Sequence, residues 1–248
     1  MLLHGRDAAK GSAAVREIRE ATGNERLSFH LADFSSLAQV CGLPEQILAE
    51  HARLDVLVNN AGIGTNWRGR SNREVSKDGY ELRFAVNYLA SFLLTRLLGP
   101  LLVHSAPTRI VNVASAGQAA IDFDDVMLER NYGGIQAYCQ SKLALVMLTF
   151  DLAGELRDRK VTANCLHPGT YMPTKMVLEA GVTPVDSLES GVEATMRLVA
   201  DPDLGGVTGE YFNRLREGRA HPQAYDADAR RQLRELSAKL VGLPGDAA

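Results

Sequence analysis

Short apolar segments alternate with longer segments of helical periodicity along this chain. Four short runs are rich in β-branched and aliphatic residues and are bounded by polar residues, which is typical of strands: 27–31, 56–59, 110–114 and 161–167. Between them, four longer stretches carry apolar residues at helical spacing and predict helices: 7–22, 36–51, 77–103 and 135–159. The alternation predicts an α/β protein, a doubly wound parallel sheet with helices on both faces.

The ends of the first predicted helix have a chemical explanation. Asp7 can cap its N-terminus, and Gly23 follows Thr22 as a C-terminal stop. No linker rich in Pro, Gly or Ser divides the 248 residues, and no internal repeat is present. One domain that spans residues 1–248 is the simplest organisation.

Composition and charge exclude several classes of protein. The chain is 46% apolar and 23% charged, as in ordinary globular proteins, and its net charge of −3 argues against nucleic acid as the main partner. The longest apolar stretch, 89–103, is interrupted by Arg96 and by Gly99-Pro100, so no membrane span is expected. The first residues are too short for a signal peptide, and a cytoplasmic location is therefore predicted.

Cysteine and histidine spacing gives no sign of a metal site or of disulfide bonds. The three cysteines, Cys41, Cys139 and Cys165, are odd in number and widely spaced, which favours a reducing compartment. No two cysteines lie two residues apart, and no two of the six histidines lie four apart. No metal ligand is predicted.

The strongest chemical signal is the pair Tyr138 and Lys142. At positions i and i+4 near the start of a predicted helix, both side chains lie on one face. A nearby ammonium favours the phenolate, and lowering a tyrosine pKa from about 10 to about 7 requires about 4 kcal/mol. A phenol tuned in this way acts as a general acid or base. The same spacing also arises by chance, as between Tyr171 and Lys175, where Pro173 interrupts the helix.

Several small or polar residues follow the predicted strands, at the sheet edge where ligands bind in open α/β folds. Ser115 follows the strand at 110–114, and small residues after the strand at 56–59 would let a flat ligand approach the backbone. Asn87 interrupts an apolar helical segment. Taken singly, each is more often an ordinary turn, cap or core residue. The residues singled out at these places are Ser115, Asn59, Asn60, Ala61, Gly62, Asn87, Pro168, Gly169 and Thr170.

Together these motifs resemble the short-chain dehydrogenase/reductase family and, within it, the retinol-dehydrogenase-like reductases. The resemblance covers residues 1 to about 242, and several moderate motifs in the right order are more specific than any one alone. The residues that carry it are Asp33, Asn59-Asn60-Ala61-Gly62, Asn87, Ser115, Tyr138 with Lys142, and His167-Pro168-Gly169-Thr170.

The resemblance implies a Rossmann-like fold and an NAD(P)-dependent oxidoreductase that acts on a small carbonyl or alcohol. Tyr138 would be the acid/base, Lys142 would tune it and bind the cofactor ribose, and Ser115 would bind the substrate oxygen. Asn87 would hold a water of a proton relay. The remaining cofactor contacts would be Asp33 at the adenine, Asn60, Ala61 and Gly62 along the adenosine ribose, and Pro168, Gly169 and Thr170 at the nicotinamide.

The start of the chain departs from the family pattern. No glycine-rich turn precedes a helix, and the residues before Gly5 resemble the family's second strand. The fold is therefore expected to be N-terminally incomplete. Either a βα unit of about 30 residues before Met1 is missing from this sequence, or the protein is a degenerate, non-catalytic member that binds a partner on the same scaffold.

Three further expectations concern ligands and assembly. Arg6, just after the first strand, could pair a 2′-phosphate, which favours NADP over NAD as the cofactor. The segment 171–190 is rich in apolar side chains between Pro and Gly residues and is expected to close over the substrate. The helices that contain Leu89 and Leu143 should be largely buried, and in the family such helices often pair in a homodimer.

Overall fold

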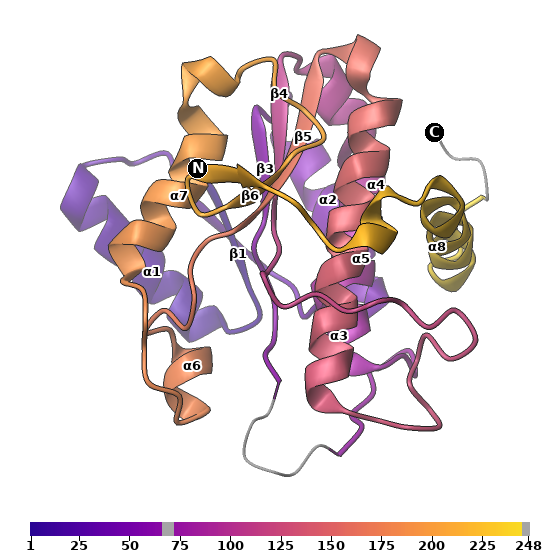
Figure 1. Cartoon of the computed structure of the whole chain (residues 1–248). Helices are drawn as coiled ribbons and strands as arrows, with labels where there is room; N and C mark the ends of the chain where they lie inside the picture. The colour runs from indigo at the N-terminus through magenta and orange to yellow at the C-terminus, as the bar shows by residue number, and fades with distance from the viewer. Residues whose placement is uncertain (66–71, 245–248) are drawn as a thin grey trace.

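The computed structural model describes residues 1–65 and 72–244, which form one α/β domain (Figure 1). The described residues form seven strands, and each pair of neighbouring strands is parallel except β6 and β7. Their bounds are β1 Leu2–Gly5, β2 Ser28–Leu31, β3 Val56–Asn59, β4 Thr108–Val113, β5 Val161–His167, β6 Tyr211–Asn213 and β7 Arg216–Gly218. The predicted fold class, α/β with a parallel sheet, is confirmed.

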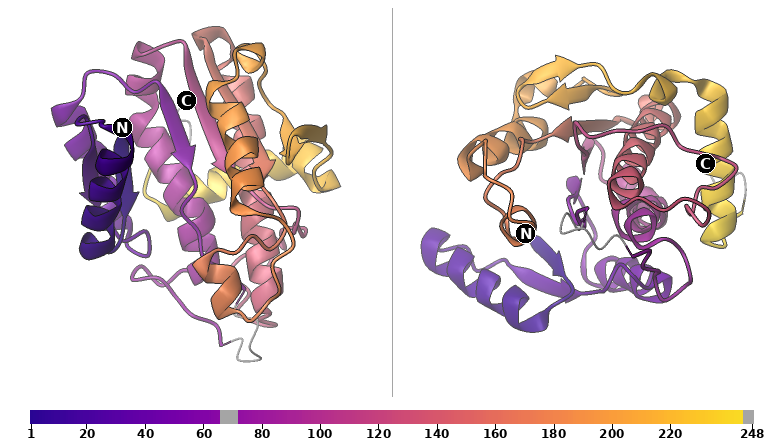
Figure 2. Two further views of the ribbon diagram at one scale, coloured as in Figure 1. Left: turned by 90° about the vertical axis from the view of Figure 1, so that its left-hand side faces the viewer. Right: turned by 60° about the horizontal axis from the view of Figure 1, so that its bottom comes forward.

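Helices cover both faces of this sheet (Figure 2). On one face, α2, α4 and α5 enclose the larger core cluster, while α7 packs against β4 and β5 on the opposite face. The helices are α1 Ala8–Thr22, α2 Leu37–Glu50, α3 Leu82–Phe84, α4 Ala90–His104, α5 Gly134–Glu155, α6 Lys175–Glu179, α7 Leu188–Ala200 and α8 Ala227–Leu240, with a π-helical turn at Ala85–Leu89 between α3 and α4.

The strands form two separate hydrogen-bonded groups. β1 pairs only with β2, whereas β3 to β7 form one five-stranded sheet in sequence order. No ladder joins β1 to β3 among the described residues, although both strands have parallel partners on their other sides. Val58 of β3 remains 39% exposed.

Both ends of α1 agree with the prediction, whereas the helix predicted at 135–159 ends at Glu155 and another helix starts later than predicted. Asp7 accepts a hydrogen bond from the Lys10 backbone N–H, and Gly23 ends α1 at a φ of +67°, as predicted. The helix predicted from residue 77 begins at Leu82, because residues 76–79 form a turn that ends at Gly79 with a φ of +86°. The Glu81 carboxylate then caps the helix at the Phe84 N–H.

The two helices that were expected to be buried are buried inside the single chain. Leu89 and Leu143 are completely buried. α8 of the same chain packs against these helices: the Tyr88 hydroxyl bonds the Ser237 hydroxyl at 2.7 Å, and Asp151 of α5 pairs with Arg230 at 2.8 Å. The segment Leu82–His104 has the length and apolar character of a membrane span, with a mean hydropathy of 1.5, but 72% of that window lies inside the protein. This is the character of a core helix.

Candidate active site

The first half of α5 places Tyr138 and Lys142 on one face, as the spacing predicts. The Lys142 ammonium lies 5.9 Å from the centroid of the Tyr138 ring and donates a 2.8 Å hydrogen bond to the Val113 carbonyl at the end of β4. Among the described residues, this is the one hydrogen bond that the Lys142 ammonium makes. The ammonium has three N–H donors, so two of them remain available to a ligand at the sheet edge.

Burial controls the proton affinity of both groups. It lowers the pKa of Lys142 to about 8, because the charged form loses its hydration. Burial also raises the pKa of Tyr138, and the hydrogen bond with the Ser115 side chain opposes that rise. The direction for Tyr138 is opposite to the effect that a neighbouring ammonium alone would have. In the protein by itself, the pKa of Tyr138 is therefore raised and not lowered as expected.

Ser115 stands directly after β4, as predicted, with its side chain toward Tyr138. Its hydroxyl accepts the Gly117 N–H at 3.0 Å, and it lies close enough to the Tyr138 phenol to lower the pKa of that group. Space at Gly117 is limited, since a Cβ there would lie 3.3 Å from the Cys139 sulfur and 3.5 Å from the Ser115 hydroxyl. The Ser115 carbonyl accepts a bond from the Tyr211 hydroxyl at 3.2 Å. The serine is therefore fixed from both sides.

Asn87 lies in the π-helical turn and is completely buried. Its amide bonds the backbone of Ile63 in both directions, accepting at 2.8 Å and donating at 3.1 Å, and it also donates to the Ser141 hydroxyl at 3.0 Å. Ser141 in turn donates to the Tyr138 carbonyl at 2.7 Å. The wide π turn, a geometry that is frequent at functional sites, joins the loop after β3 to α5.

Glycine at position 62 favours this close approach of loop and helix. A Cβ at Gly62 would lie 3.3 Å from Oδ1 of Asn87 and 3.5 Å from Nζ of Lys142. Ala61 is half-buried beside it, and the Asn60 side chain is exposed. Asn59 instead faces the interior, where it donates to Asn112 at 2.8 Å. Neighbouring asparagines thus have different roles, one in the core and one at the surface.

The turn after β5 contains Pro168, Gly169 and Thr170, each of them half-buried. The Thr170 N–H donates to the Asp186 carboxylate at 2.6 Å, and Arg214 donates to the same carboxylate at 2.6 Å and 2.9 Å. These bonds lower the pKa of Asp186, the bond from Thr170 most of all. The carboxylate therefore fixes this turn from outside the sheet.

Arg6 and Asp33 belong to the other group of strands, at the ends of β1 and β2. The Arg6 side chain is exposed. Asp33 accepts the Ser35 N–H at 3.0 Å and pairs with Lys77 at 3.6 Å. Among the described residues, neither side chain makes a hydrogen bond or an ion pair with Tyr138, Lys142, Ser115 or Asn87.

A buried ion pair missed by the sequence analysis supports the loop after β3. The Arg83 side chain is only 2% exposed and donates to the Gly64 carbonyl at 2.9 Å and to the Tyr132 hydroxyl at 2.6 Å. Its guanidinium also pairs with Glu81 at 3.3 Å. Single-residue patterns could not reveal this cluster, because its members come from separate segments of the chain.

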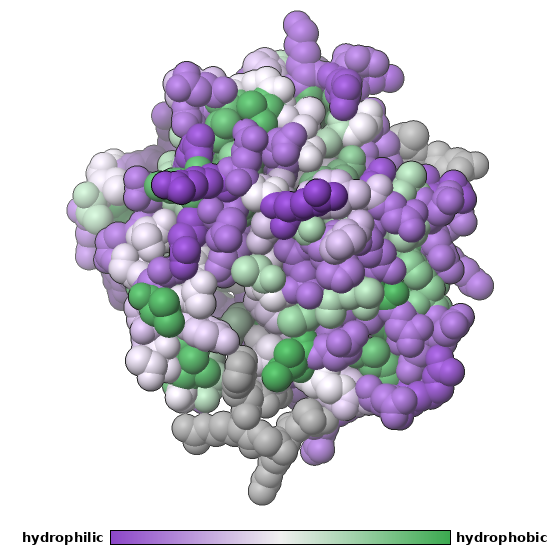
Figure 3. All heavy atoms as spheres, viewed as in Figure 1, coloured by the Kyte–Doolittle hydropathy of each residue, from purple (hydrophilic) through white to green (hydrophobic). Residues whose placement is uncertain are grey.

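The segment 171–190, predicted as a loop that covers the substrate, contains the short helix α6 and lies against the site. A Cβ at Gly64 would meet the Met176 side chain at 2.7 Å, so this helix touches the loop after β3. Met176 and Leu178 remain 41% and 56% exposed. Figure 3 shows apolar surface over α6, next to a hollow between this helix and the body of the molecule.

Comparison with known proteins places this geometry in a family. A family model described as short chain dehydrogenase matches residues 1–183. Retinol dehydrogenase 13 of Homo sapiens is 36% identical, over 98% of this chain and 77% of the relative, and retinol dehydrogenase 14 of Homo sapiens is 36% identical over 96% and 77%.

Solved structures agree with this assignment. An uncharacterized protein of Mycobacterium paratuberculosis superposes with a TM-score of 0.73 at 25% identity, over 98% of this chain and 84% of the other. A short chain dehydrogenase of Shigella flexneri, complexed with NADP, superposes with a TM-score of 0.69 at 24% identity, over 87% and 86%, and shows the shared fold. This chain therefore belongs to the short chain dehydrogenase family and is an enzyme of the oxidoreductase class.

Proposed function

We propose that this protein interconverts an alcohol and a carbonyl compound with NADP(H), with NAD(H) as the alternative cofactor. The observation that carries the proposal is that three groups lie together: the Tyr138 phenol, the Ser115 hydroxyl that lowers its pKa, and the buried Lys142 ammonium 5.9 Å from the centroid of the phenol ring. An acid/base group, a second hydroxyl for the same oxygen and a fixed cation are the parts that carbonyl reduction needs.

In this proposal Tyr138 gives a proton to the carbonyl oxygen in reduction and takes one from the alcohol in oxidation. Ser115 donates a hydrogen bond to the same oxygen, where charge develops. Asn87, which is bonded to the Ile63 backbone, would hold a water molecule that passes the proton onward from Tyr138. Because Lys142 has donors left after bonding Val113, it can bind ribose hydroxyls and stabilise the phenolate at once.

The residues present fit a nicotinamide cofactor. Gly62 lets the loop after β3 come close to Asn87 and Lys142 at the sheet edge, and Pro168 to Thr170 follow β5 at the same edge. When bound, the cofactor supplies or accepts the hydride. Asp33, Asn60 and Ala61 are the proposed contacts of its adenosine part.

Arg6 supports the preference for NADP. It is exposed directly after β1, where Gly5 offers no carboxylate for a ribose 2′-hydroxyl. The next carboxylate, Asp7, caps α1 through the Lys10 N–H at 3.1 Å and pairs with the Lys10 ammonium. A free guanidinium beside an occupied carboxylate favours a phosphate over a hydroxyl.

The proposed substrate is a small or medium apolar alcohol or carbonyl compound. Met176 and Leu178 of the covering segment are apolar and partly exposed beside the site. Because the relatives carry the name retinol dehydrogenase, retinol and its aldehyde are the first compounds to test.

A cytoplasmic location and a homodimer stay predictions, and no observation favours the non-catalytic alternative.

The test compares Tyr138→Phe with the wild type in NADPH-dependent reduction of retinal and of shorter aldehydes. Removing one hydroxyl should abolish turnover and leave the circular dichroism spectrum unchanged. Tyr80→Phe is the matched control, since the Tyr80 hydroxyl bonds the Leu240 carbonyl at the C-terminal end of the fold, and it should keep activity. Wild-type turnover by Tyr138→Phe would contradict the assigned role.

A further inference from the structure

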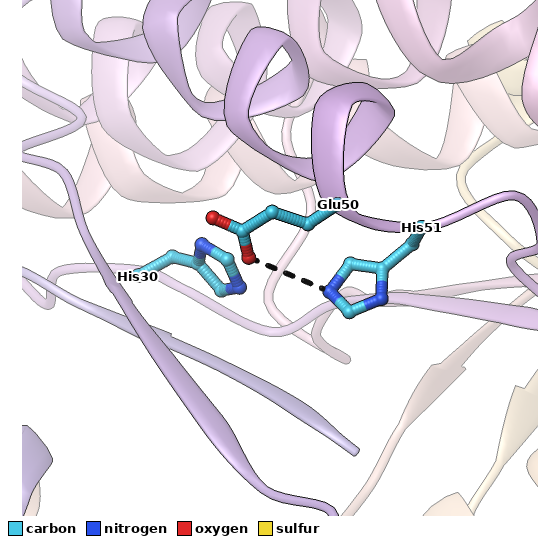
Figure 4. A group of neighbouring side chains, drawn as sticks. All are labelled: His30, Glu50 and His51. Atoms are coloured by element: carbon cyan, nitrogen blue, oxygen red, sulfur yellow. Dashed lines mark ion pairs between the residues drawn. The ribbon is translucent and has the colours of Figure 1, made fainter.

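A second chemical site lies at the other end of the sheet, where α2 ends beside β2. His30 of β2, Glu50 at the last position of α2 and His51 directly after it bring two imidazoles and a carboxylate together (Figure 4). One ligand atom from each residue lies within 4.8 Å of the other two. Figure 4 shows the carboxylate between the rings, and each ring turns a nitrogen toward it.

Nε2 of His51 is a buried polar atom whose hydrogen-bonding capacity is not satisfied by the described residues. The nearest oxygen of Glu50 is 3.8 Å away, which is too long for a hydrogen bond. A buried polar atom without a partner calls for an explanation, and a bound ion is one of the ordinary ones.

The three ligand atoms lie within 4.8 Å of one another and would have to move only a little closer to bind a small divalent cation. Ligands of a tetrahedral zinc ion lie about 2.0–2.1 Å from the metal, and so about 3.3 Å from one another. The 3.8 Å between Glu50 and His51 is near this spacing. The Glu50 side chain is 57% exposed and can rotate to shorten its own distances to the two imidazoles. Its carboxylate would also neutralise part of the ion's charge.

His30 is held in place before any ion binds. It is only 5% exposed, and its Nε2 lies 3.0 Å from the Ser28 hydroxyl on the same face of β2. The rings of His30 and His51 meet edge to face, with centroids 6.3 Å apart and planes at 75°. A rigid histidine on a strand and a movable pair at a helix end form a site that can close around an ion.

We propose that His30, Glu50 and His51 bind one divalent transition-metal ion of the zinc type, with water as the fourth ligand. Two imidazoles and one carboxylate with an open position are a donor set that zinc accepts in proteins. The site lies apart from the proposed catalytic group and links β2 to α2, which packs against α4. Its role would be to tie the β1–β2 pair to the helices that cover the larger sheet.

The test is titration of the metal-free protein with Co²⁺, followed by the visible absorption of the bound ion and then by competition with Zn²⁺. We expect one Co²⁺ per chain, displaced by Zn²⁺, and a higher melting temperature in Zn²⁺. Both His51→Ala and Glu50→Gln should weaken binding at least tenfold. Glu50→Gln removes only the charge of an exposed side chain and keeps the test valid if a histidine variant folds poorly.

Two control variants separate this site from other ligands. His104→Ala removes an exposed histidine at the end of α4, and Cys41→Ser removes the half-buried thiol of α2. Both should bind Co²⁺ like the wild type. Absence of binding by the wild type, or equal affinities of His51→Ala, Glu50→Gln and the wild type, would overturn the proposal. Loss of binding in Cys41→Ser would overturn it in favour of a thiolate site.

Discussion

Replacing Lys142 by Met should make the protein more stable at neutral pH. Burial lowers the pKa of Lys142 from its ordinary 10.5 to about 8, so the charged side chain lowers the free energy of unfolding. Each pKa unit corresponds to about 1.4 kcal/mol, which makes that decrease about 3 kcal/mol at pH 7. The variant loses the bond to the Val113 carbonyl, and a buried carbonyl left alone costs about 1–3 kcal/mol. The net expectation is a gain of about 1 kcal/mol.

The same shift predicts that this gain reverses with pH. Between pH 8 and pH 10.5 the unfolded chain binds more protons at Lys142 than the folded chain does, so the wild type becomes more stable as the pH rises. From pH 7 to pH 9.5 the wild type should gain about 2 kcal/mol relative to Lys142→Met. At pH 9.5 the variant should therefore be about 1 kcal/mol less stable than the wild type.

The assay is urea unfolding followed by far-ultraviolet circular dichroism at pH 7 and pH 9.5. Other groups titrate in this range, but they do so in both proteins and cancel in the difference. Lys239→Met, at an exposed position of α8, is the matched control and should show no pH-dependent difference from the wild type. A stability difference between Lys142→Met and the wild type that is the same at both pH values would refute the reasoning.

Three further predictions test the geometry of the site and of the core. Gly62→Ala should weaken NADPH binding in a fluorescence titration, because the added Cβ would lie 3.3 Å from the Asn87 oxygen. Ser115→Ala should lower kcat by about 100- to 1,000-fold with a smaller change in KM, the usual effect of losing one donor to a developing oxyanion. Tyr88→Phe should cost about 1 kcal/mol in urea unfolding, since it removes the 2.7 Å bond to Ser237.

The sequence was sufficient for the elements with strong local signals. The strands at 56–59 and 161–167 and the capped helix after Asp7 follow from β-branched runs and from one cap residue, and the structure has them at those places. The sequence predicted Ser115 at the end of one strand and Tyr138 near the start of the next long helix, and the structure has both residues at those places.

What the sequence did not predict depends on contacts between distant segments. β6 has three residues, too few for a periodic signal, and α8 presents a polar surface over much of its length. His30 and His51 have no metal-ligand spacing, and only the packing of α2 against the sheet brings them together. The direction of the Tyr138 pKa was missed because burial, a tertiary property, outweighs the neighbouring hydroxyl.

The division of the strands into two groups has a consequence for how the molecule opens. Because no backbone ladder joins β1 to β3 among the described residues, no strand-to-strand hydrogen bonds couple the β1–α1–β2 unit to the five-stranded sheet. Such a unit opens at a lower free energy than the rest of a domain. Amide protons of β1 and β2 should therefore exchange with solvent through a sub-global opening, while those of β4 and β5, whose residues are almost all buried, should wait for global unfolding.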